Sequence, residues 1–168
     1  MNNKNYNINE LLDRLAQQIR DWMQERHIDD PLIVGIHTSG VWIADELQKR
    51  LQLADEPGEL NMTFYRDDFS RVGLHPQSKP SLLPDVDDRH ILLVDDVLYT
   101  GRTIRGAMNE LFDFGRPASI TAAVLVARGG RELPIEAQLT ALREEPGFEY
   151  SYEVSGPEPL SLTLIAKQ

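Results

Sequence analysis

Residues 91–103 read ILLVDDVLYTGRT, and this stretch decides the fold of the 168-residue chain. Its first four residues are apolar and form a run that is typical of a buried strand in a parallel sheet. Asp95 and Asp96 follow at the carboxyl end of that strand, and a turn of small and hydroxyl-bearing residues leads into a helical pattern that begins at Thr103. The stretch therefore predicts a strand, a turn and a helix, an arrangement that places ligands at the carboxyl edge of a sheet.

The turn suits an anion because backbone N–H groups at a helix start have no partner inside the helix, and the helix dipole adds positive potential there. Thr100 and Thr103 can donate hydrogen bonds, and Gly101 lets the backbone approach a phosphate. Asp95 and Asp96 suit sugar hydroxyls, as carboxylates do in dinucleotide-binding folds. A ribose phosphate fits both halves of the pattern. The alternative is that the aspartates merely end a strand and that Thr103 caps the helix.

The complete pattern resembles the 5-phosphoribosyl-1-pyrophosphate (PRPP) signature of type I phosphoribosyltransferases. The resemblance implies that Asp95 and Asp96 take part in catalysis, together with Arg66. It also implies that the whole segment binds PRPP. The expected PRPP-binding residues are Asp95, Asp96, Val97, Leu98, Tyr99, Thr100, Gly101, Arg102 and Thr103.

A second segment, residues 35–40 with the sequence GIHTSG, looks like the pyrophosphate loop of the same family. The resemblance implies that backbone amides of His37, Thr38, Ser39 and Gly40 meet the leaving group. Many relatives have an arginine where this chain has Ser39. The backbone must therefore supply more of the pyrophosphate binding here.

Three shorter segments are similar to one branch of the family, the pyrimidine operon regulatory proteins of the PyrR type, which also have uracil phosphoribosyltransferase activity. They are residues 65–69 (YRDDF), 115–119 (GRPAS) and 131–135 (RELPI), and the resemblance covers roughly residues 8–136. It implies that PRPP and uracil are substrates, that UMP and UTP are ligands, and that pyrimidine operon leader RNA is a partner. Two alternatives remain, which are an RNA-binding attenuator with weak or no catalysis, and a phosphoribosyltransferase for a purine or orotate.

The base pocket and a lid are expected from the same resemblance. Val126, Arg128 and Arg131 are the candidates for contacting the base, although either arginine could pair with surface acids instead. Residues 66–80 are the candidate for a flexible lid, in which Arg66 or Arg71 reaches the pyrophosphate or is simply solvated. The lid candidates are Arg66, Asp67, Asp68 and Arg71.

The composition of the chain argues against several classes of function. The net charge of -10 and the pI near 4.8 oppose nonspecific nucleic-acid binding, and the best remaining basic candidates for RNA are Arg14, Arg20, Arg26, Lys49 and Arg50. No cysteine is present, and no run reaches the roughly 18 apolar residues of a membrane span. We therefore expect a cytoplasmic protein without a membrane partner. Separately, we expect a homo-oligomer. We expect Mg²⁺ as cofactor, held mainly by substrate and water rather than by protein ligands.

The fold expected for residues 1–168 is a single α/β domain of the type I phosphoribosyltransferase kind, with a mostly parallel central sheet flanked by helices and a flexible lid loop. The periodicity of apolar residues predicts the elements. Helices are expected at residues 9–26, 41–51 and 103–114, and strands at residues 32–36, 62–65, 91–94 and 120–126. A long loop is expected between residues 66 and 89, and no element is assigned beyond residue 136.

Overall fold

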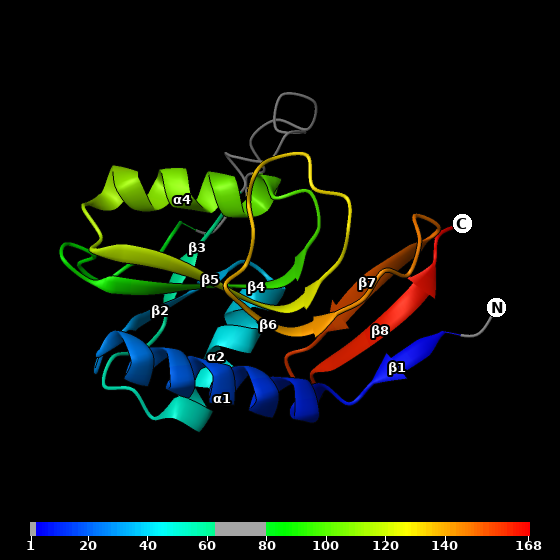
Figure 1. Cartoon of the computed structure of the whole chain (residues 1–168), viewed down its shortest axis with the longest axis horizontal. Helices are drawn as coiled ribbons and strands as arrows, with labels where there is room; N and C mark the ends of the chain where they lie inside the picture. Colours follow the sequence, from blue (N-terminus) through cyan, green and yellow to red (C-terminus); the bar gives the residue numbers. More distant parts are fainter. Residues whose placement is uncertain (1–2, 63–79) are drawn as a thin grey trace.

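The computed structural model describes residues 3–62 and 80–168, and a five-stranded sheet forms its centre (Figure 1). The described elements are β1 (Lys4–Tyr6), α1 (Ile8–Arg26), β2 (Leu32–Ile36), α2 (Ser39–Leu51), β3 (Gly58–Leu60), β4 (His90–Leu98), α4 (Arg102–Phe114), β5 (Ser119–Ala127), β6 (Leu139–Arg143), β7 (Tyr150–Ser155) and β8 (Ser161–Ala166).

The central sheet has the strand order β3-β2-β4-β5-β6, and every neighbouring pair is parallel. Side chains that alternate along β4 enter two cores on opposite faces. Leu92 and Val94 pack with α1 and α2, whereas Ile91 and Leu93 pack with α4. The helices therefore lie on both sides of the sheet (Figure 1). This burial on two faces explains why β2 and β4 read as continuous apolar runs.

Helix α1 illustrates how local sequence sets an element. The Asn7 side chain accepts a hydrogen bond from the Glu10 amide at 3.3 Å and so caps the helix, and His27 ends it in the left-handed conformation. Leu15 and Ile19 are completely buried on the face that meets the sheet. The helix predicted at residues 9–26 is confirmed, with a start one residue earlier.

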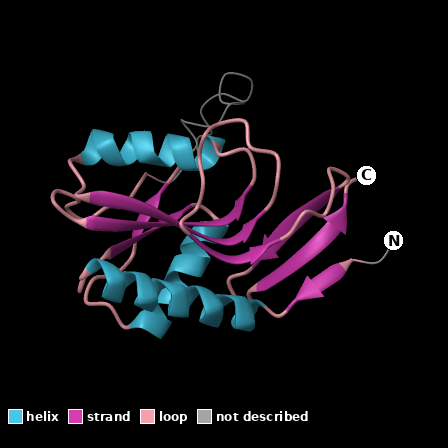
Figure 2. Ribbon diagram, in the orientation of Figure 1, coloured by secondary structure: helices cyan, strands magenta, loops and turns pink. Residues whose placement is uncertain are grey.

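A second sheet was not anticipated. Strands β1, β8 and β7 form a three-stranded antiparallel sheet beside the main one (Figure 2). Glu144, which follows β6, joins its strands by accepting hydrogen bonds from Lys4 Nζ at 2.6 Å, from Tyr152 Oη at 2.7 Å and from Tyr6 Oη. One carboxylate thus connects residues from both ends of the described chain to the edge of the central sheet.

Several predicted boundaries were wrong. Strand β4 continues to Leu98, so Asp95 and Asp96 lie inside the strand rather than after it, because its pairing with β5 extends to Leu98↔Ala127. Strand β3, at Gly58–Leu60, was not predicted. Of the strand predicted at residues 62–65, Met62 lies in coil, and residues 63–65 lie outside the described residues.

The helix starts also differ from the prediction. Helix α2 begins at Ser39, two residues earlier than predicted. Helix α4 begins at Arg102 and its cap is Gly101, so Thr103 lies inside the first turn and does not cap the helix. Phe112, which shares the apolar pattern of α4, is 47% exposed. No helix in the described ranges has the length and apolar character needed to cross a membrane.

Candidate active site

Two loops meet at the carboxyl edge of the central sheet. One joins β2 to α2 and contains residues 37 and 38, and the other joins β4 to α4 through residues 99–101. Because β2 and β4 are parallel neighbours, both helix N-termini lie at the same edge of the sheet. Each helix start carries backbone N–H groups that have no acceptor inside the helix. The fold therefore places side by side two helix N-termini, which are structures that can bind anions.

The two aspartates of β4 lie directly against the first of these loops. Ser39 Oγ donates a hydrogen bond to Asp96 Oδ2 at 2.6 Å. A β-carbon added to Gly40 would lie 2.7 Å from the Val94 carbonyl oxygen and 3.5 Å from Asp95 Oδ1. Gly40 thus allows the start of α2 to approach β4, as required if the pyrophosphate and ribose sites are to be adjacent.

The aspartates are also oriented by the backbone that follows them. Asp95 is only 7% exposed, and its Oδ1 accepts a hydrogen bond from the Asp96 amide at 2.9 Å. Asp96 is half-buried, and its Oδ1 accepts from the Val97 amide at 2.7 Å. Each carboxylate therefore has a fixed direction, which favours recognition of sugar hydroxyls over a merely solvated charge.

The loop before α4, residues 99–101, is shaped by a hydroxyl and a glycine. Thr100 Oγ1 accepts a hydrogen bond from the Arg102 amide at 3.2 Å, which leaves the hydroxyl hydrogen to donate to a ligand. Gly101 has φ of 92°, and a β-carbon there would lie 3.0 Å from Ile135 Cβ. Glycine is needed both for this backbone conformation and for the close packing.

His37 has a structural partner. Its Nε2 lies 2.8 Å from Glu59 Oε2 on β3, and its backbone amide donates to the Leu60 carbonyl at 2.8 Å. The peptide bond between His37 and Thr38 is cis, and the Thr38 side chain is exposed. The pyrophosphate-binding role of His37, Thr38, Ser39 and Gly40 stays a prediction, now with a defined geometry.

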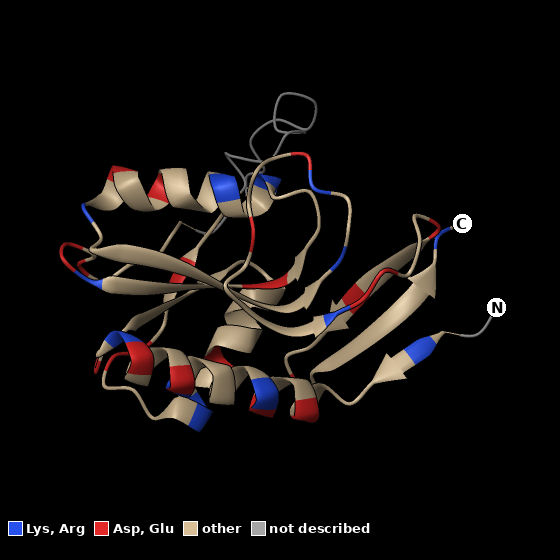
Figure 3. Ribbon diagram, in the orientation of Figure 1, with Lys and Arg blue, Asp and Glu red and all other residues tan. Residues whose placement is uncertain are grey.

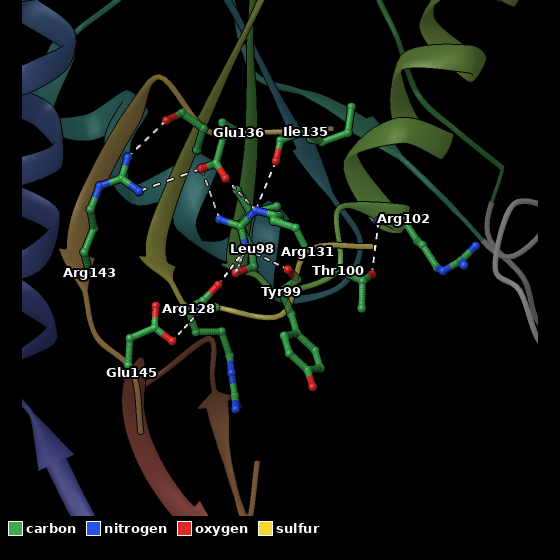
Figure 4. A network of polar contacts seen from close by, with 12 residues as sticks. Leu98, Tyr99, Thr100, Arg102, Arg128, Arg131, Ile135, Glu136, Arg143 and Glu145 are labelled. Carbon is green, nitrogen blue, oxygen red and sulfur yellow. Dashed lines mark hydrogen bonds and ion pairs between the residues drawn. The ribbon is translucent and has the colours of Figure 1, made fainter. Parts of the chain in front are cut away.

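Residues 128–136, here named the covering segment, lie against the loop at residues 99–101 (Figure 4). The amides of Glu132 and Leu133 donate to the Thr100 carbonyl at 2.9 and 3.3 Å. Arg102 Nε pairs with Glu132 Oε2 at 2.7 Å. The covering segment therefore holds both the loop and the first residue of α4.

Arg131 organises the covering segment. Its Nη1 donates to the carbonyls of Tyr99 and Arg128, both at 2.6 Å, and its Nε donates to the Ile135 carbonyl at 3.0 Å (Figure 4). It also pairs with Glu136 at 3.1 Å. Of the two roles considered for Arg131, the structure supplies the acidic partner, while a contact with the base stays a prediction.

Arg128 is not exposed, and among residues 3–62 and 80–168 no acid forms an ion pair with it. It is 5% exposed, and its Nη1 and Nη2 donate to the Tyr150 and Gly147 carbonyls, both at 2.8 Å. The side chain of Val126 is fully buried in the core. The two residues are thus enclosed by protein in this structure, and a base-binding role for either of them stays a prediction.

Four of the predicted site residues lie outside the residues that the structure describes. Arg66, Asp67, Asp68 and Arg71 belong to residues 63–79, which lie outside the described residues, so their lid and catalytic roles stay predictions. Within residues 3–62 and 80–168, no cluster of three or more His, Cys, Asp or Glu side chains could hold a metal ion.

Two contacts in the site were missed from the sequence. Ser39 was expected in the pyrophosphate loop, where it replaces an arginine of many relatives, but its hydrogen bond to Asp96 was not inferred. Glu132 was part of a matched motif, but no spacing rule linked it to Arg102, which lies 30 positions earlier. The adjacent glycines at 129 and 130 were the one available signal that the chain approaches another segment closely there.

Comparison with known proteins agrees with this geometry. Residues 6–159 match the phosphoribosyl transferase domain family. The chain is 49% identical over 161 residues to the bifunctional protein PyrR of Nitrosococcus oceani, covering 94% of this chain and 91% of the relative. It is also 49% identical to the bifunctional protein PyrR of Pseudomonas paraeruginosa over 154 residues, with 91% of each chain covered.

Solved structures show the same fold at lower identity. A hypoxanthine-guanine-xanthine phosphoribosyltransferase aligns with a TM-score of 0.66 at 18% identity, covering 97% of this chain and 93% of that chain. A hypoxanthine-guanine phosphoribosyltransferase from Bacillus anthracis aligns with a TM-score of 0.67 at 11% identity, covering 83% and 82%. The predicted type I phosphoribosyltransferase fold is confirmed. The chain belongs to the phosphoribosyl transferase family and, within it, to the bifunctional PyrR proteins.

Proposed function

We propose that this protein transfers a phosphoribosyl group from PRPP to uracil, forming UMP and pyrophosphate, and that it also regulates pyrimidine genes through their leader RNA. The observation that carries the enzymatic half is the pair of helix N-termini at adjacent strand ends, with Asp95 and Asp96 on the strand between them. The high identity to bifunctional PyrR proteins supports both halves.

The parts of PRPP match the parts of the site. The 5-phosphate fits the start of α4, where Thr100 and Thr103 add hydroxyl donors to the backbone N–H groups. The pyrophosphate fits the start of α2, where the backbone of residues 37–40 takes the place of a positive side chain. Asp95 and Asp96 then lie beside the ribose, where each can accept hydrogen bonds from hydroxyls.

The reaction is a displacement at C1 of the ribose. A ring nitrogen of uracil forms the new bond to C1 and loses its proton, while the bond from C1 to the pyrophosphate oxygen breaks and its electron pair leaves with pyrophosphate. Positive charge develops on the sugar in a transition state with oxocarbenium character, as in glycoside cleavage. The carboxylates of Asp95 and Asp96 favour this charge, and the fixed amides at the α2 start favour the departing anion.

Mg²⁺ fits the donor set at this edge, since carboxylates, hydroxyls and phosphates offer oxygen atoms only. Bound together with PRPP it would neutralise the pyrophosphate, with its ligands coming mainly from substrate and water. Asp96 is the protein carboxylate best placed to meet it through a water or a sugar hydroxyl, because this side chain is half-buried and oriented by Ser39.

RNA recognition has a narrower structural basis. Two of the five basic residues suggested on the first two helices form ion pairs: Arg50 lies 2.9 Å from Asp13 and 2.8 Å from Glu46, and Lys49 lies 2.8 Å from Glu46. Arg14 and Arg20 donate hydrogen bonds to the carbonyls of Ala141 and Arg50. Lysine and arginine also alternate with acids over the visible face of the ribbon (Figure 3). We therefore propose selective binding of a structured leader hairpin, with little general attraction to RNA.

The function is tested by incubating the protein with PRPP and Mg²⁺ and, in separate reactions, with uracil, orotate, hypoxanthine and guanine. We expect nucleotide formation with uracil. Formation only with another base would contradict the proposed acceptor, and formation with none would contradict the enzymatic half.

Titration with the cognate leader hairpin and an unrelated hairpin at several salt concentrations tests the RNA half. We expect tight binding of the cognate hairpin alone. Equal binding of both hairpins would contradict the proposed selectivity, and binding of neither would contradict the regulatory half.

A further inference from the structure

Arg128 carries a charge into the protein interior without an acidic partner. It is 5% exposed, and among residues 3–62 and 80–168 no carboxylate lies at ion-pair distance from it. Its Nε is buried and has no hydrogen-bond partner. A buried charge of this kind is costly, and an apolar side chain could fill the same volume without that cost. The benefit of the arginine must therefore lie in what its guanidinium contacts.

The guanidinium contacts two segments that are distant in sequence. Its two terminal nitrogens donate to the carbonyls of Gly147 and Tyr150, where the chain enters the hairpin of β7 and β8. Its guanidinium carbon lies over the Tyr99 ring, 4.6 Å from the ring centroid, and the two side chains lie near each other in Figure 4. A cation over an aromatic ring gains more when water is excluded, as it is at this buried position.

Gly130 and Arg131 also confine Tyr99. A β-carbon on Gly130 would overlap the Tyr99 ring, so this glycine, at φ of 115°, leaves just enough space for it. The Tyr99 carbonyl accepts a hydrogen bond from Arg131 at 2.6 Å. Both the ring and the backbone of Tyr99 are thus fixed immediately before Thr100 and Gly101, at the start of α4.

We infer that Arg128 is a positioning residue that holds Tyr99, and through it the loop that binds the phosphoribosyl group, against the hairpin of β7 and β8. The inference rests on the proposed phosphoribosyl transfer. If the loop had no such support, only a fraction of molecules would hold it in the binding conformation. The apparent affinity for PRPP would fall by that fraction, whereas the rate at saturating PRPP would stay the same.

The test compares Arg128→Met with Arg128→Lys, and uses Arg89→Met as a matched control. Arg89 also joins loops, through Asp55 at 2.9 Å and the Asp30 carbonyl at 3.4 Å, but it lies before β4, at the other end of the sheet. We expect Arg128→Met to raise the KM for PRPP roughly tenfold with kcat within about twofold, and Arg128→Lys to restore part of the loss because it keeps the charge. Arg89→Met should keep the KM of the unmodified protein.

Two outcomes would overturn the inference. An unchanged KM for PRPP in Arg128→Met, together with a lower Tm, would make Arg128 a purely structural support of the hairpin. A rise in the KM for uracil alone would make it a base contact. If Arg128→Met does not fold, the Arg128→Lys variant and the double-mutant cycle below carry the test.

A double-mutant cycle on Arg128 and Tyr99 gives a further check of the inference. Tyr99→Leu should raise the KM for PRPP, and adding Arg128→Lys to it should raise KM no further, because Arg128→Lys only weakens a contact that Tyr99→Leu has already removed. Fully additive effects would overturn the inference.

Amide hydrogen exchange separates this inference from the proposed function. Exchange of the amides at residues 99–101, measured without substrates, should be faster in Arg128→Lys than in the unmodified protein and unchanged in Arg89→Met. Equal protection in all three proteins would overturn the inference. Failure of the unmodified protein to form any nucleotide would instead contradict the proposed function and leave this measurement intact.

Discussion

Ser39 Oγ and Asp96 Oδ2 lie 2.6 Å apart, and this hydrogen bond joins the start of α2 to the end of β4. The two residues are 57 positions apart in sequence, yet together they connect the expected pyrophosphate and ribose sites. The serine adds a second hydrogen bond to a carboxylate that the Val97 amide already orients through the other oxygen. A residue that looked like a loss of positive charge therefore has a defined task in this chain.

Removal of that hydroxyl should weaken catalysis. We expect Ser39→Ala to lower kcat/KM roughly tenfold, since hydrogen bonds to charged groups contribute about 1.5 to 3 kcal/mol. Steady-state kinetics with PRPP and uracil measure the effect. Ser155→Ala is the matched control, because Ser155 also faces a carboxylate, Glu153, at 3.5 Å but lies on the exposed hairpin. Equal activity of both variants would show that the Asp96 contact is dispensable.

The two aspartates should each matter for transfer. We expect Asp95→Asn and Asp96→Asn to reduce the rate of UMP formation at least about tenfold, because each loses the charge that strengthens hydrogen bonds to the ribose. Asp87→Asn provides the control, since Asp87 accepts a hydrogen bond from the Arg116 amide at 2.7 Å on a loop before β4. Unchanged kinetics in both site variants would remove the proposed ribose contact.

A substitution at Thr103 distinguishes a role in ligand binding from a role in helix stability. Because Gly101 caps α4 and Thr103 is an exposed residue of its first turn, Thr103→Ala removes no cap. We expect an unchanged or slightly higher Tm, since alanine favours helix, and a higher KM for PRPP. Asn109→Ala, an exposed change farther along the same helix, should leave KM unaltered. A lower Tm with an ordinary KM in Thr103→Ala would point to a structural role instead.

The carboxylate of Glu144 should make stability depend on pH. Burial by itself raises its pKa, but hydrogen bonds from Lys4, Tyr6 and Tyr152 outweigh that effect and lower the pKa from 4.5 to about 2. Its stabilising contribution is thus fully present above about pH 4.5, and it is lost as the pH falls toward 2.

Glu144→Gln tests this dependence by urea unfolding at several pH values. We expect the variant to be less stable by about 1 kcal/mol at pH 7, with the difference shrinking below about pH 4.5. Glu153→Gln, an exposed change on β7, should show no such trend. A difference that stays constant down to pH 3 would refute the assignment.

Much of the fold follows from local patterns. Apolar runs identified β2, β4 and β5 because both faces of these strands are buried, and helical spacing identified α1 because Leu15 and Ile19 face the sheet. The ends of the strands were less predictable. The length of β4, for example, depends on its pairing with β5 rather than on the hydrophobicity of its own residues.

The antiparallel sheet shows the limit of such reasoning. Tyr150, Tyr152 and Val154 alternate with polar residues, as do Leu162 and Leu164, so strands were detectable in principle. Their arrangement was not, because β8 pairs with β1, which has only three residues and no pattern of its own. The contacts of Arg128 depend on this arrangement and were beyond prediction for the same reason.

The pairing of β1 with β8 also orders events during synthesis of the chain. Lys4 pairs with Leu164, so β1 leaves the ribosome long before its partner exists. The five parallel strands are complete once residue 143 has emerged, whereas the carbonyls of Gly147 and Tyr150 that hold Arg128 follow later. A nascent chain can thus assemble the sheet that carries Asp95 and Asp96 before it can brace Tyr99. Competence to bind substrate would then be acquired late, after most of the core has formed.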